Sequence, residues 1–400
     1  MVELSCCCAR REDRRAEQGK RLPTESYDLA VVGAGIVGLA CALAAARRGK
    51  RVAVIDRDAQ ANGASIRNFG FVTVTGQARG EMWARARRSR DIWDEVAPQA
   101  GIPILHRGLV VTARRDEAVE VLQAFLETEM GEGCRLLASG EVRRDHPHLA
   151  GQELRGALWS PHDLRVESRQ AIPRLTAWLA ERHGVRFLWG AAALAVETGS
   201  VSTTRGVIEA DAVAVCPGDD LHSLFPEVAA AAGVTRCKLQ MLRLADPGYR
   251  LAAAVMSDLG LARYAGYAAL PQAAALVARL NAEQPQHLAD GVHLIVVQSA
   301  DGSLVVGDSH HYAATPDPFS RQAVDGLILD EFAAVFGPAV PPVVERWTGT
   351  YASAQDRTVL VDTPTAGVRL VMVTTGAGAS TGFALGEEVV ADLMGEGTMK

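Results

Sequence analysis

A glycine-rich turn between an apolar strand and an apolar helix is the feature that most constrains this chain. Residues 27–32 have the composition of a short buried strand, and they run into the sequence GAGIVG at residues 33–38. Residues 36–49 then place Ala and Leu at helical spacing and end in a glycine. Residues 50–56, KRVAVID, have the pattern of a second buried strand. Strand, helix and strand in this order predict a parallel sheet of the Rossmann type.

The glycines of this turn match the G-x-G-x-x-G pattern of dinucleotide-binding sites. Gly33 permits the tight turn, Gly35 lets a pyrophosphate approach the backbone, and Gly38 lets helix and strand pack closely. The helix N-terminus offers free N–H groups to phosphates. Asp56, 18 residues after Gly38, should accept hydrogen bonds from ribose hydroxyls. The cofactor-binding residues predicted in this unit are Gly33, Ala34, Gly35, Ile36, Val37, Gly38, Asp56 and Arg57.

Two further glycine-containing loops favour FAD over NAD. GASIRNFGFV, residues 63–72, follows the second strand, where its side chains can donate to phosphate or flavin carbonyls. GAGASTGF, residues 376–383, opens the last predicted helix, whose N–H groups can stabilise a reduced flavin's negative charge. The FAD-binding residues predicted here are Ser65, Arg67, Asn68, Gly376, Gly378, Ser380, Thr381, Gly382 and Phe383. The first turn alone also allows an NAD-binding or purely regulatory Rossmann protein.

Composition bounds the class of protein and its surroundings. The chain has 400 residues, a net charge of −6 and 48% apolar residues, as expected for an enzyme and not for a nucleic-acid-binding protein. Its seven cysteines include no C-x-x-C pair, so we expect reduced thiols, a cytoplasmic location and no metal site. No apolar run approaches the roughly 18 residues of a spanning helix. We expect residues 1–26 to be a disordered extension.

The pattern along the chain predicts two domains of a mixed α/β fold. Segments with buried-strand and glycine-loop character lie near both ends, whereas residues 234–310 carry alternating strands typical of an antiparallel sheet with one buried face. We predict a Rossmann-like FAD-binding domain from residues 27–90, 150–222 and 344–400. A discontinuous substrate domain, built on a mixed or antiparallel sheet, should comprise residues 91–149 and 223–343.

From Tyr27 to about Gly395 the chain resembles the D-amino-acid-oxidase-like (DAO) flavoproteins, which include glycine oxidase and sarcosine oxidase. Five motifs occur in the order of that family: VVGAGIVGL, GASIRNFG, AVAVCPG, the Trp347–Gly349 W-T-G motif and TTGAG. The resemblance implies covalent or non-covalent FAD, oxidation of a C–N bond of a small amine, and O2 or another electron acceptor. Carried over by motif, Ala193 lies near the adenine and Gly218 near the FAD.

One position departs from the glycine and sarcosine oxidase pattern. Relatives commonly continue W-x-G with x-R-P, whose Arg holds the substrate carboxylate, but Tyr351 stands at the Arg position here. A phenol cannot replace a bidentate guanidinium. GASIRNFGFV, CKLQMLR, DGSLVVGDSHHY and RWTGTYAS further resemble a subgroup associated with bacterial aminophosphonate breakdown. That resemblance implies oxidation of 2-aminoethylphosphonate, or of an N-alkyl derivative, to phosphonoacetaldehyde; glycine, sarcosine or D-amino acids are the alternative substrates.

A phosphonate requires cations and N–H donors, and several residues could supply them. Lys238 is a rare lysine in an otherwise apolar strand, where it could anchor the phosphonate or activate oxygen beside the flavin. With Lys238 we assign Tyr351 and His310 as catalytic candidates. The substrate-binding candidates are Arg67, Gln240, Arg243, Tyr264, Tyr267, His310 and Tyr351.

Overall fold

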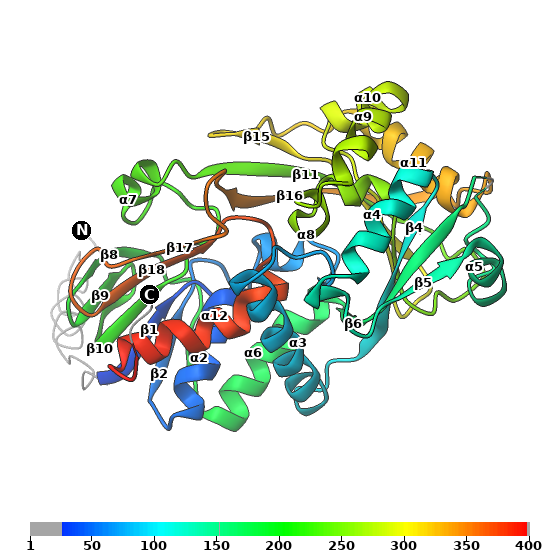
Figure 1. The fold of residues 1–400 in the computed structure, drawn as a ribbon. Coiled ribbons are helices and arrows are strands. Elements are labelled where there is room, and N and C mark those ends of the chain that lie inside the picture. The colour runs from blue at the N-terminus through cyan, green and yellow to red at the C-terminus, as the bar shows by residue number, and fades with distance from the viewer. Residues whose placement is uncertain (1–25, 152, 398–400) are drawn as a thin grey trace, which may run out of the picture.

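The computed structural model describes residues 26–151 and 153–397. The expected disordered extension, residues 1–26, therefore lies outside the described residues except for Ser26. The described chain folds around two β-sheets, called here sheet A and sheet B, which lie side by side with helices on their outer faces (Figure 1). The fold is the predicted mixed α/β type with a Rossmann-like part.

Sheet A contains the predicted strand–helix–strand unit. Its path runs β17-β18-β10-β1-β2-β7, and the hairpin strands β8 and β9 extend it from β10. The first strand pairs in parallel with β10 on one side and β2 on the other, so the carboxyl ends of all three open onto one edge. The strands are β1 (Ser26–Val32), β2 (Val52–Ile55), β7 (Arg186–Leu188), β8 (Ala193–Glu197), β9 (Ser200–Thr203), β10 (Gly206–Val215), β17 (Val359–Asp362) and β18 (Val368–Val373).

Helices α2 (Ile36–Arg47) and α12 (Gly378–Leu393) pack on sheet A, and α3 (Glu81–Gln99) packs in turn on α12 and α6 (Ser168–His183) on α2. Almost all of α2 is buried because small alanine side chains let it pack closely against its neighbours. A Cβ atom added to Gly386 of α12 would lie 2.6 Å from the carbonyl carbon of Ala40. This close approach joins the two glycine-loop helices, which lie side by side in Figure 1 although they come from opposite ends of the chain.

Sheet B carries the rest of the strands and is mixed. Its path runs β15-β11-β14-β13-β12-β4-β6-β3; β16 pairs with β11 and β5 with β6. All pairs are antiparallel except β4 with β12. The strands are β3 (Phe71–Val72), β4 (Ile104–Ala113), β5 (Arg135–Ala138), β6 (Gly156–Val166), β11 (Thr235–Leu244), β12 (Ala254–Met256), β13 (Ile295–Gln298), β14 (Leu304–Gly307), β15 (His311–Ala313) and β16 (Val343–Ser353).

The remaining helices pack on sheet B or lie in the connections. They are η2 (Ala64–Ile66), α4 (Asp116–Leu126), η3 (Glu129–Gly131), α5 (Ser139–Asp145), α7 (Pro226–Ala231), η4 (Asp258–Ala262), α8 (Ala265–Ala268), α9 (Ala273–Glu283), α10 (Pro285–Ala289) and α11 (Gln322–Phe336). Both β6 and β16 pair within sheet B, although we expected segments 150–222 and 344–400 to belong to the FAD-binding domain. The predicted boundary between residues 343 and 344 thus falls within β16.

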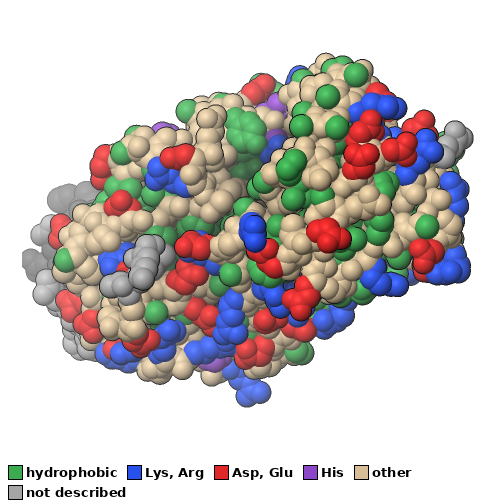
Figure 2. Space-filling view, in the orientation of Figure 1, with side chains coloured by type: hydrophobic (Ala, Val, Ile, Leu, Met, Phe, Trp, Pro, Cys, Tyr) green, Lys and Arg blue, Asp and Glu red, His purple; other side chains and the backbone are tan. Residues whose placement is uncertain are grey.

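The face drawn in Figure 2 shows lysine and arginine side chains interspersed with acidic ones, without a broad surface of one sign. No helix in residues 26–151 or 153–397 combines the length and apolarity needed to cross a lipid bilayer. Cys41, Cys134, Cys216 and Cys237 are all free thiols.

Candidate active site

A cavity of about 480 Å³ lies where the edge of sheet A meets sheet B. Its wall begins at the glycine turn before α2, continues along the loop of residues 63–72, and includes the loop before α12. At the other end the wall is formed by side chains from β16 and from the ends of β13 and β14. The cavity therefore reaches from the predicted nucleotide-binding turn to the predicted substrate domain.

The glycine turn is fixed by close backbone contacts. A Cβ atom on Gly33, whose φ is +101°, would lie 2.3 Å from the carbonyl oxygen of Cys216. On Gly38 it would lie 1.9 Å from the carbonyl oxygen of Gly33. The Ala34 amide donates to Asp56 Oδ2 over 2.8 Å, so the acid also holds the turn. Only glycine fits at Gly33 and Gly38, for reasons of packing in the protein itself.

The loop of residues 63–72 uses most of its polar side chains to hold itself and α2. Ser65 Oγ accepts a hydrogen bond of 2.9 Å from the Ile36 amide, at the N-terminus of α2. Asn68 donates to the Ala64 carbonyl over 2.8 Å and accepts from the Gly70 amide over 2.7 Å. Arg67, with one long hydrogen bond of 3.3 Å to Asn62, is the charged group that this loop contributes to the cavity wall.

The loop before α12 approaches the cavity through its backbone. Gly376 has a φ of +73°, and a Cβ atom there would lie 3.0 Å from the ring of Tyr351. Ser380 Oγ accepts from the Thr73 amide over 2.8 Å, which ties the loop to the strand that follows residues 63–70. Phe383 instead packs on Trp93, with ring centroids 5.0 Å apart, in the core below.

The predicted cofactor residues fall into two groups. Those on the cavity wall are Gly35, Ile36, Val37, Gly38, Ser65, Arg67, Asn68, Gly218, Gly376, Gly378 and Ser380. Those outside it are Gly33, Ala34, Asp56, Arg57, Ala193, Thr381, Gly382 and Phe383. Both helix N-termini, α2 and α12, open onto the same cavity, and glycine leaves its wall free of side chains where they begin. These features fit FAD, whose diphosphate and reduced ring both need N–H donors at close range.

The sheet B end of the cavity is lined by titratable side chains. Arg263, which follows η4, donates to the Tyr312 hydroxyl over 2.8 Å. No carboxylate in the described part of the chain forms an ion pair with this guanidinium, although most arginines here have one. The other titratable residues at this end are Tyr264, His293, Asp308, His310, Tyr312 and Tyr351.

Burial shifts the protonation of these groups. It raises the pKa of Asp308 to about 8, although Arg263 opposes the shift. Burial, with the nearby charge of Arg263, holds the pKa of His293 and of His310 well below the usual value. Burial also raises the pKa of the Tyr351 phenol well above its ordinary value. The histidines and phenols are therefore neutral near pH 7, and Arg263 is the fixed positive charge of this end.

The structure does not bring four of the predicted catalytic and substrate-binding residues to the cavity. Lys238 donates to the Asp317 and Phe319 carbonyls over 2.5 and 2.7 Å, which occupies its ammonium group. Gln240 donates to Asp325 and to the Arg321 carbonyl. Tyr267 is fully buried against Phe125, with ring centroids 4.6 Å apart. None of the three lines the cavity.

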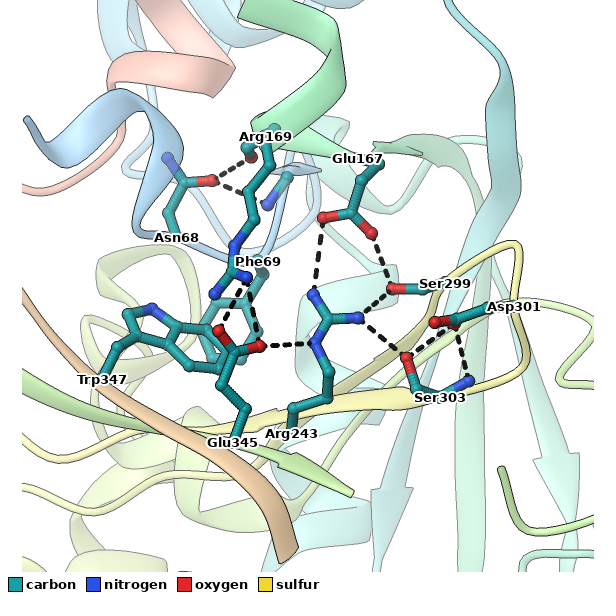
Figure 3. Close-up of polar contacts among 12 residues, drawn as sticks. Asn68, Phe69, Glu167, Arg169, Arg243, Ser299, Asp301, Ser303, Glu345 and Trp347 are labelled. Carbon is teal, nitrogen blue, oxygen red and sulfur yellow. Dashed lines mark hydrogen bonds and ion pairs between the residues drawn. The ribbon is translucent and has the colours of Figure 1, made fainter. Parts of the chain in front are cut away.

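Arg243, the fourth candidate, lies in a network of its own (Figure 3). Its guanidinium contacts Glu345 at 3.2 Å and Glu167 at 3.8 Å, and it donates to Ser299 and Ser303. Two carboxylates already balance its charge, so the side chain joins β11 to β16 and to the start of α6. Tyr264, His310, Tyr351 and Arg67 are the substrate candidates that do line the cavity.

Sequence reasoning missed Arg263, His293, Asp308 and Tyr312. Arg263 stands directly before the candidate Tyr264, and Asp308 and Tyr312 lie within the motif DGSLVVGDSHHY. The available signal was a cluster of titratable residues at the end of an apolar strand. His293 precedes β13 without such a cluster, and only the pairing of β13 with β14 brings it beside Asp308.

Comparison with known proteins agrees with this geometry. The family model described as FAD dependent oxidoreductase (DAO) matches residues 28–393. Glycine oxidase from Geobacillus kaustophilus is 27% identical over 209 residues, which cover 49% of this chain and 55% of that protein. The bifunctional protein ThiO/ThiG from Nostoc sp. is 29% identical over 231 residues, which cover 55% of this chain and 34% of that protein. The chain thus spans about half or less of the length of these curated relatives.

A solved structure shares the fold over nearly the whole chain. Glycine oxidase from Bacillus cereus superimposes with a TM-score of 0.75 at 17% sequence identity, covering 93% of this chain and 96% of that one. At this identity the likeness concerns the arrangement of sheets and helices.

Proposed function

We propose a reaction from one premise: this chain belongs to the family of FAD-dependent oxidoreductases, so it is an oxidoreductase and its cofactor is FAD. The reaction that we propose is oxidation of the C–N bond of a small amine that also carries an anionic group. The amine would lie at the sheet B end of the cavity, and FAD along the glycine loops of sheet A.

The observation that carries this proposal is Arg263 on the cavity wall. Its guanidinium is partly buried, donates to a phenol, and has no carboxylate partner among the described residues. Burial acts to lower its pKa, but Tyr312, Tyr351 and the nearby Asp308, which forms no ion pair with it, more than offset this, so the net shift is upward and the charge is retained. A charged group at a cavity wall is costly unless an anion pairs with it. An anionic group of the substrate is the partner that this position requires.

Arg263 could also replace the anion-binding arginine that is missing at the position of Tyr351. At the β16 position where relatives commonly have an arginine, this chain has the neutral phenol of Tyr351. The guanidinium of Arg263, directly after η4, takes its place as the cation. Its fork can bind a carboxylate or a phosphonate through two N–H groups, and the Tyr312 hydroxyl lies beside it. The anion would therefore be held from a different wall, which changes the direction in which the amine extends.

The remaining residues position the amine and exclude water. When bound, FAD accepts the hydride equivalent that leaves the carbon next to the amine. Tyr351, beneath Gly376, and the apolar side chains of Phe69 and Leu239 line the space between the two ends. A dry wall disfavours the ammonium form of the substrate, and only the neutral amine can lose a hydride to give an imine.

Within this class we propose 2-aminoethylphosphonate or its N-methyl derivative as the first substrate to test, because of the motif resemblance and the absent β16 arginine. Glycine or sarcosine is the second candidate, which the similarity to glycine oxidase favours. O2 or another acceptor would reoxidise the cofactor, and a cytoplasmic location remains a prediction.

Anaerobic stopped-flow reduction of the purified holoenzyme tests the proposal. We expect bleaching of the flavin absorbance by 2-aminoethylphosphonate or its N-methyl form, with glycine, sarcosine and D-alanine slower. Propylamine, which has no anionic group, should reduce the flavin poorly. Rapid reduction by propylamine would contradict the role of Arg263, and reduction only by amino acids would replace the first substrate candidate by the second.

A further inference from the structure

Three buried side chains at the sheet B end of the cavity have unused hydrogen-bonding atoms. Asp308 follows β14, and its backbone exchanges hydrogen bonds with that of His293, which precedes β13. His293, Asp308 and His310 are 3%, 4% and 8% exposed, and one ligand atom from each lies within 4.8 Å of the others. Asp308 Oδ1 and both ring nitrogens of His293 have no hydrogen-bond partner among the described residues. Buried polar atoms without partners are rare and call for a ligand or a proton.

We propose that Asp308, flanked by His293 and His310, is the subsite that binds the amino group of the substrate and takes one proton from it. This inference rests on the proposed function and names the second anchoring point of the same substrate. Arg263 would hold the anionic end, and Asp308 the cationic end, of a short zwitterion.

The geometry of the two histidines leaves acceptors for an ammonium group. His310 Nδ1 lies 2.9 Å from the Gly291 carbonyl oxygen, which can only accept, so Nδ1 carries the proton of the neutral ring. Its Nε2 then has a lone pair and no partner in the described chain. His293 Nδ1 lies 3.2 Å from Asp308 Oδ1 without the angle of a hydrogen bond. An ammonium group offers three N–H donors to such a set of acceptors.

The proton transfer balances without any other reactant. The N–H bond of R–CH₂–NH₃⁺ breaks and leaves its electron pair on nitrogen, while an O–H bond forms on the carboxylate of Asp308. The products are R–CH₂–NH₂ and a neutral carboxylic acid. The transfer neutralises both the ammonium and the carboxylate at a buried position. Burial favours this outcome, since it raises the pKa of Asp308 to about 8. The neutral amine is the form that can be oxidised.

The charges around Asp308 favour an amine over a metal ion. The titratable and charged groups that face it from neighbouring elements are Arg263, Tyr264, His293, His310 and Cys237. Arg263 already acts on all members of the His293, Asp308 and His310 cluster. A divalent ion would add two positive charges beside that guanidinium, whereas an ammonium group adds one and loses it on proton transfer.

Ligand binding gives a test that does not depend on turnover. The chemically reduced holoenzyme, which cannot oxidise an amine, is titrated anaerobically with 2-hydroxyethylphosphonate, which lacks the amine, and with 2-aminoethylphosphonate; glycolate and glycine form a second pair. In each pair we expect the wild type to bind the amine at least tenfold more tightly than the hydroxyl compound. Asp308→Asn should bind both equally, with an unchanged affinity for the hydroxyl compound. Exposed Asp330→Asn on α11 is the matched control and should behave as the wild type.

The pH dependence of anaerobic reduction completes the test. The reduction rate divided by the dissociation constant should rise with pH through an ionisation near 8 in the wild type. Asp308→Asn should lose this ionisation and roughly 100-fold of the rate, a typical contribution of a proton acceptor, with flavin content unchanged. An intact amine preference in Asp308→Asn would overturn the subsite. So would a stoichiometric metal in the purified wild type that the variant lacks. If no amine reduces the flavin, the proposed function fails, and the titrations still decide the subsite.

Discussion

The sheet A end of the cavity is rich in glycine turns and helix N-termini, whereas the sheet B end is rich in titratable side chains. The first end consists of glycine turns and helix N-termini, and its polar side chains such as Ser65 mostly bond to the protein itself. The second end gathers Arg263, His293, Asp308 and Tyr351 from four separate segments. An end rich in glycine turns suits a cofactor that all family members share. An end rich in titratable side chains can change with the substrate while the fold is kept.

Replacing Arg263 by Ala should have the largest effect and should act on the substrate end alone. We expect kcat/KM for an anionic amine to fall by about 2–5 kcal/mol, because the substrate anion would be left buried without a partner. FAD affinity should stay unchanged.

Arg250→Ala is the matched control, since Arg250 is exposed and forms its ion pair in the described part of the chain with Asp246, away from the cavity. A loss of flavin in Arg263→Ala, with normal kinetics in the remaining holoenzyme, would break the division between the two ends.

Replacing Asp56 by Ala tests the opposite end. The variant leaves the Ala34 amide without its acceptor and removes the group expected to bind the ribose hydroxyls, at a cost of about 1–3 kcal/mol in FAD affinity. The dissociation constant, measured by flavin fluorescence on reconstituted apoprotein, should rise accordingly. Asp58→Ala, at an exposed position next to it, should leave the affinity unchanged. Equal affinities in both variants would show that Asp56 serves only the turn.

The stability of the free protein should reveal the strain of burying Asp308. Its folded-state pKa is raised to about 8, so between about pH 4 and pH 8 folding takes up a proton that the unfolded carboxylate lacks. The contribution of Asp308 to the free energy of unfolding is therefore fully present below about pH 4, and it is lost as the pH rises toward 8. The Asn variant cannot titrate, so its stability relative to the wild type should increase over this range.

The increase should be at most about 1.4 kcal/mol for each pH unit. Chemical denaturation of both proteins at pH 6.5 and 7.5 measures it. The pKa values of His293 and His310 are lowered, so these residues reduce the stability of the protein only as the pH falls below about 6.5. Both proteins contain them, so their effect cancels in the comparison. A difference that is the same at both pH values would contradict the raised pKa.

Replacing Arg67 by Ala should have the smallest effect. It tests whether the loop of residues 63–72 belongs to the cofactor end or to the substrate end of the cavity. Arg67 lines the cavity, and within the described residues its guanidinium makes a single long hydrogen bond, to Asn62. We expect a loss of less than about 1 kcal/mol, as for a solvated charge, in either FAD affinity or KM. Comparing the two measurements in one variant assigns Arg67 to the cofactor end or to the substrate end. Wild-type values for both would leave it as a surface charge.

The first glycine turn could be read from the sequence because its residues are adjacent and each glycine has a steric reason. Gly33 and Gly38 are required by contacts of 2.3 and 1.9 Å within one strand–turn–helix unit and its neighbouring strand. The loop of residues 63–72 could be located but its hydrogen bonds could not. A polar side chain such as Asn68 has both local and distant partners available, and only the folded loop selects among them.

The sequence by itself determined the Rossmann-like unit, the position of the glycine-containing loops and the mixed sheet, because these follow from spacing and hydrophobic pattern within short segments. Only the tertiary structure decided which charged residues face the cavity. Lys238 and Arg263 are both cations in apolar surroundings, yet one is turned to the carbonyls of Asp317 and Phe319 and the other to the cavity. The direction of a long side chain depends on partners far away in sequence, and its charge is satisfied by whichever of them the fold brings within reach.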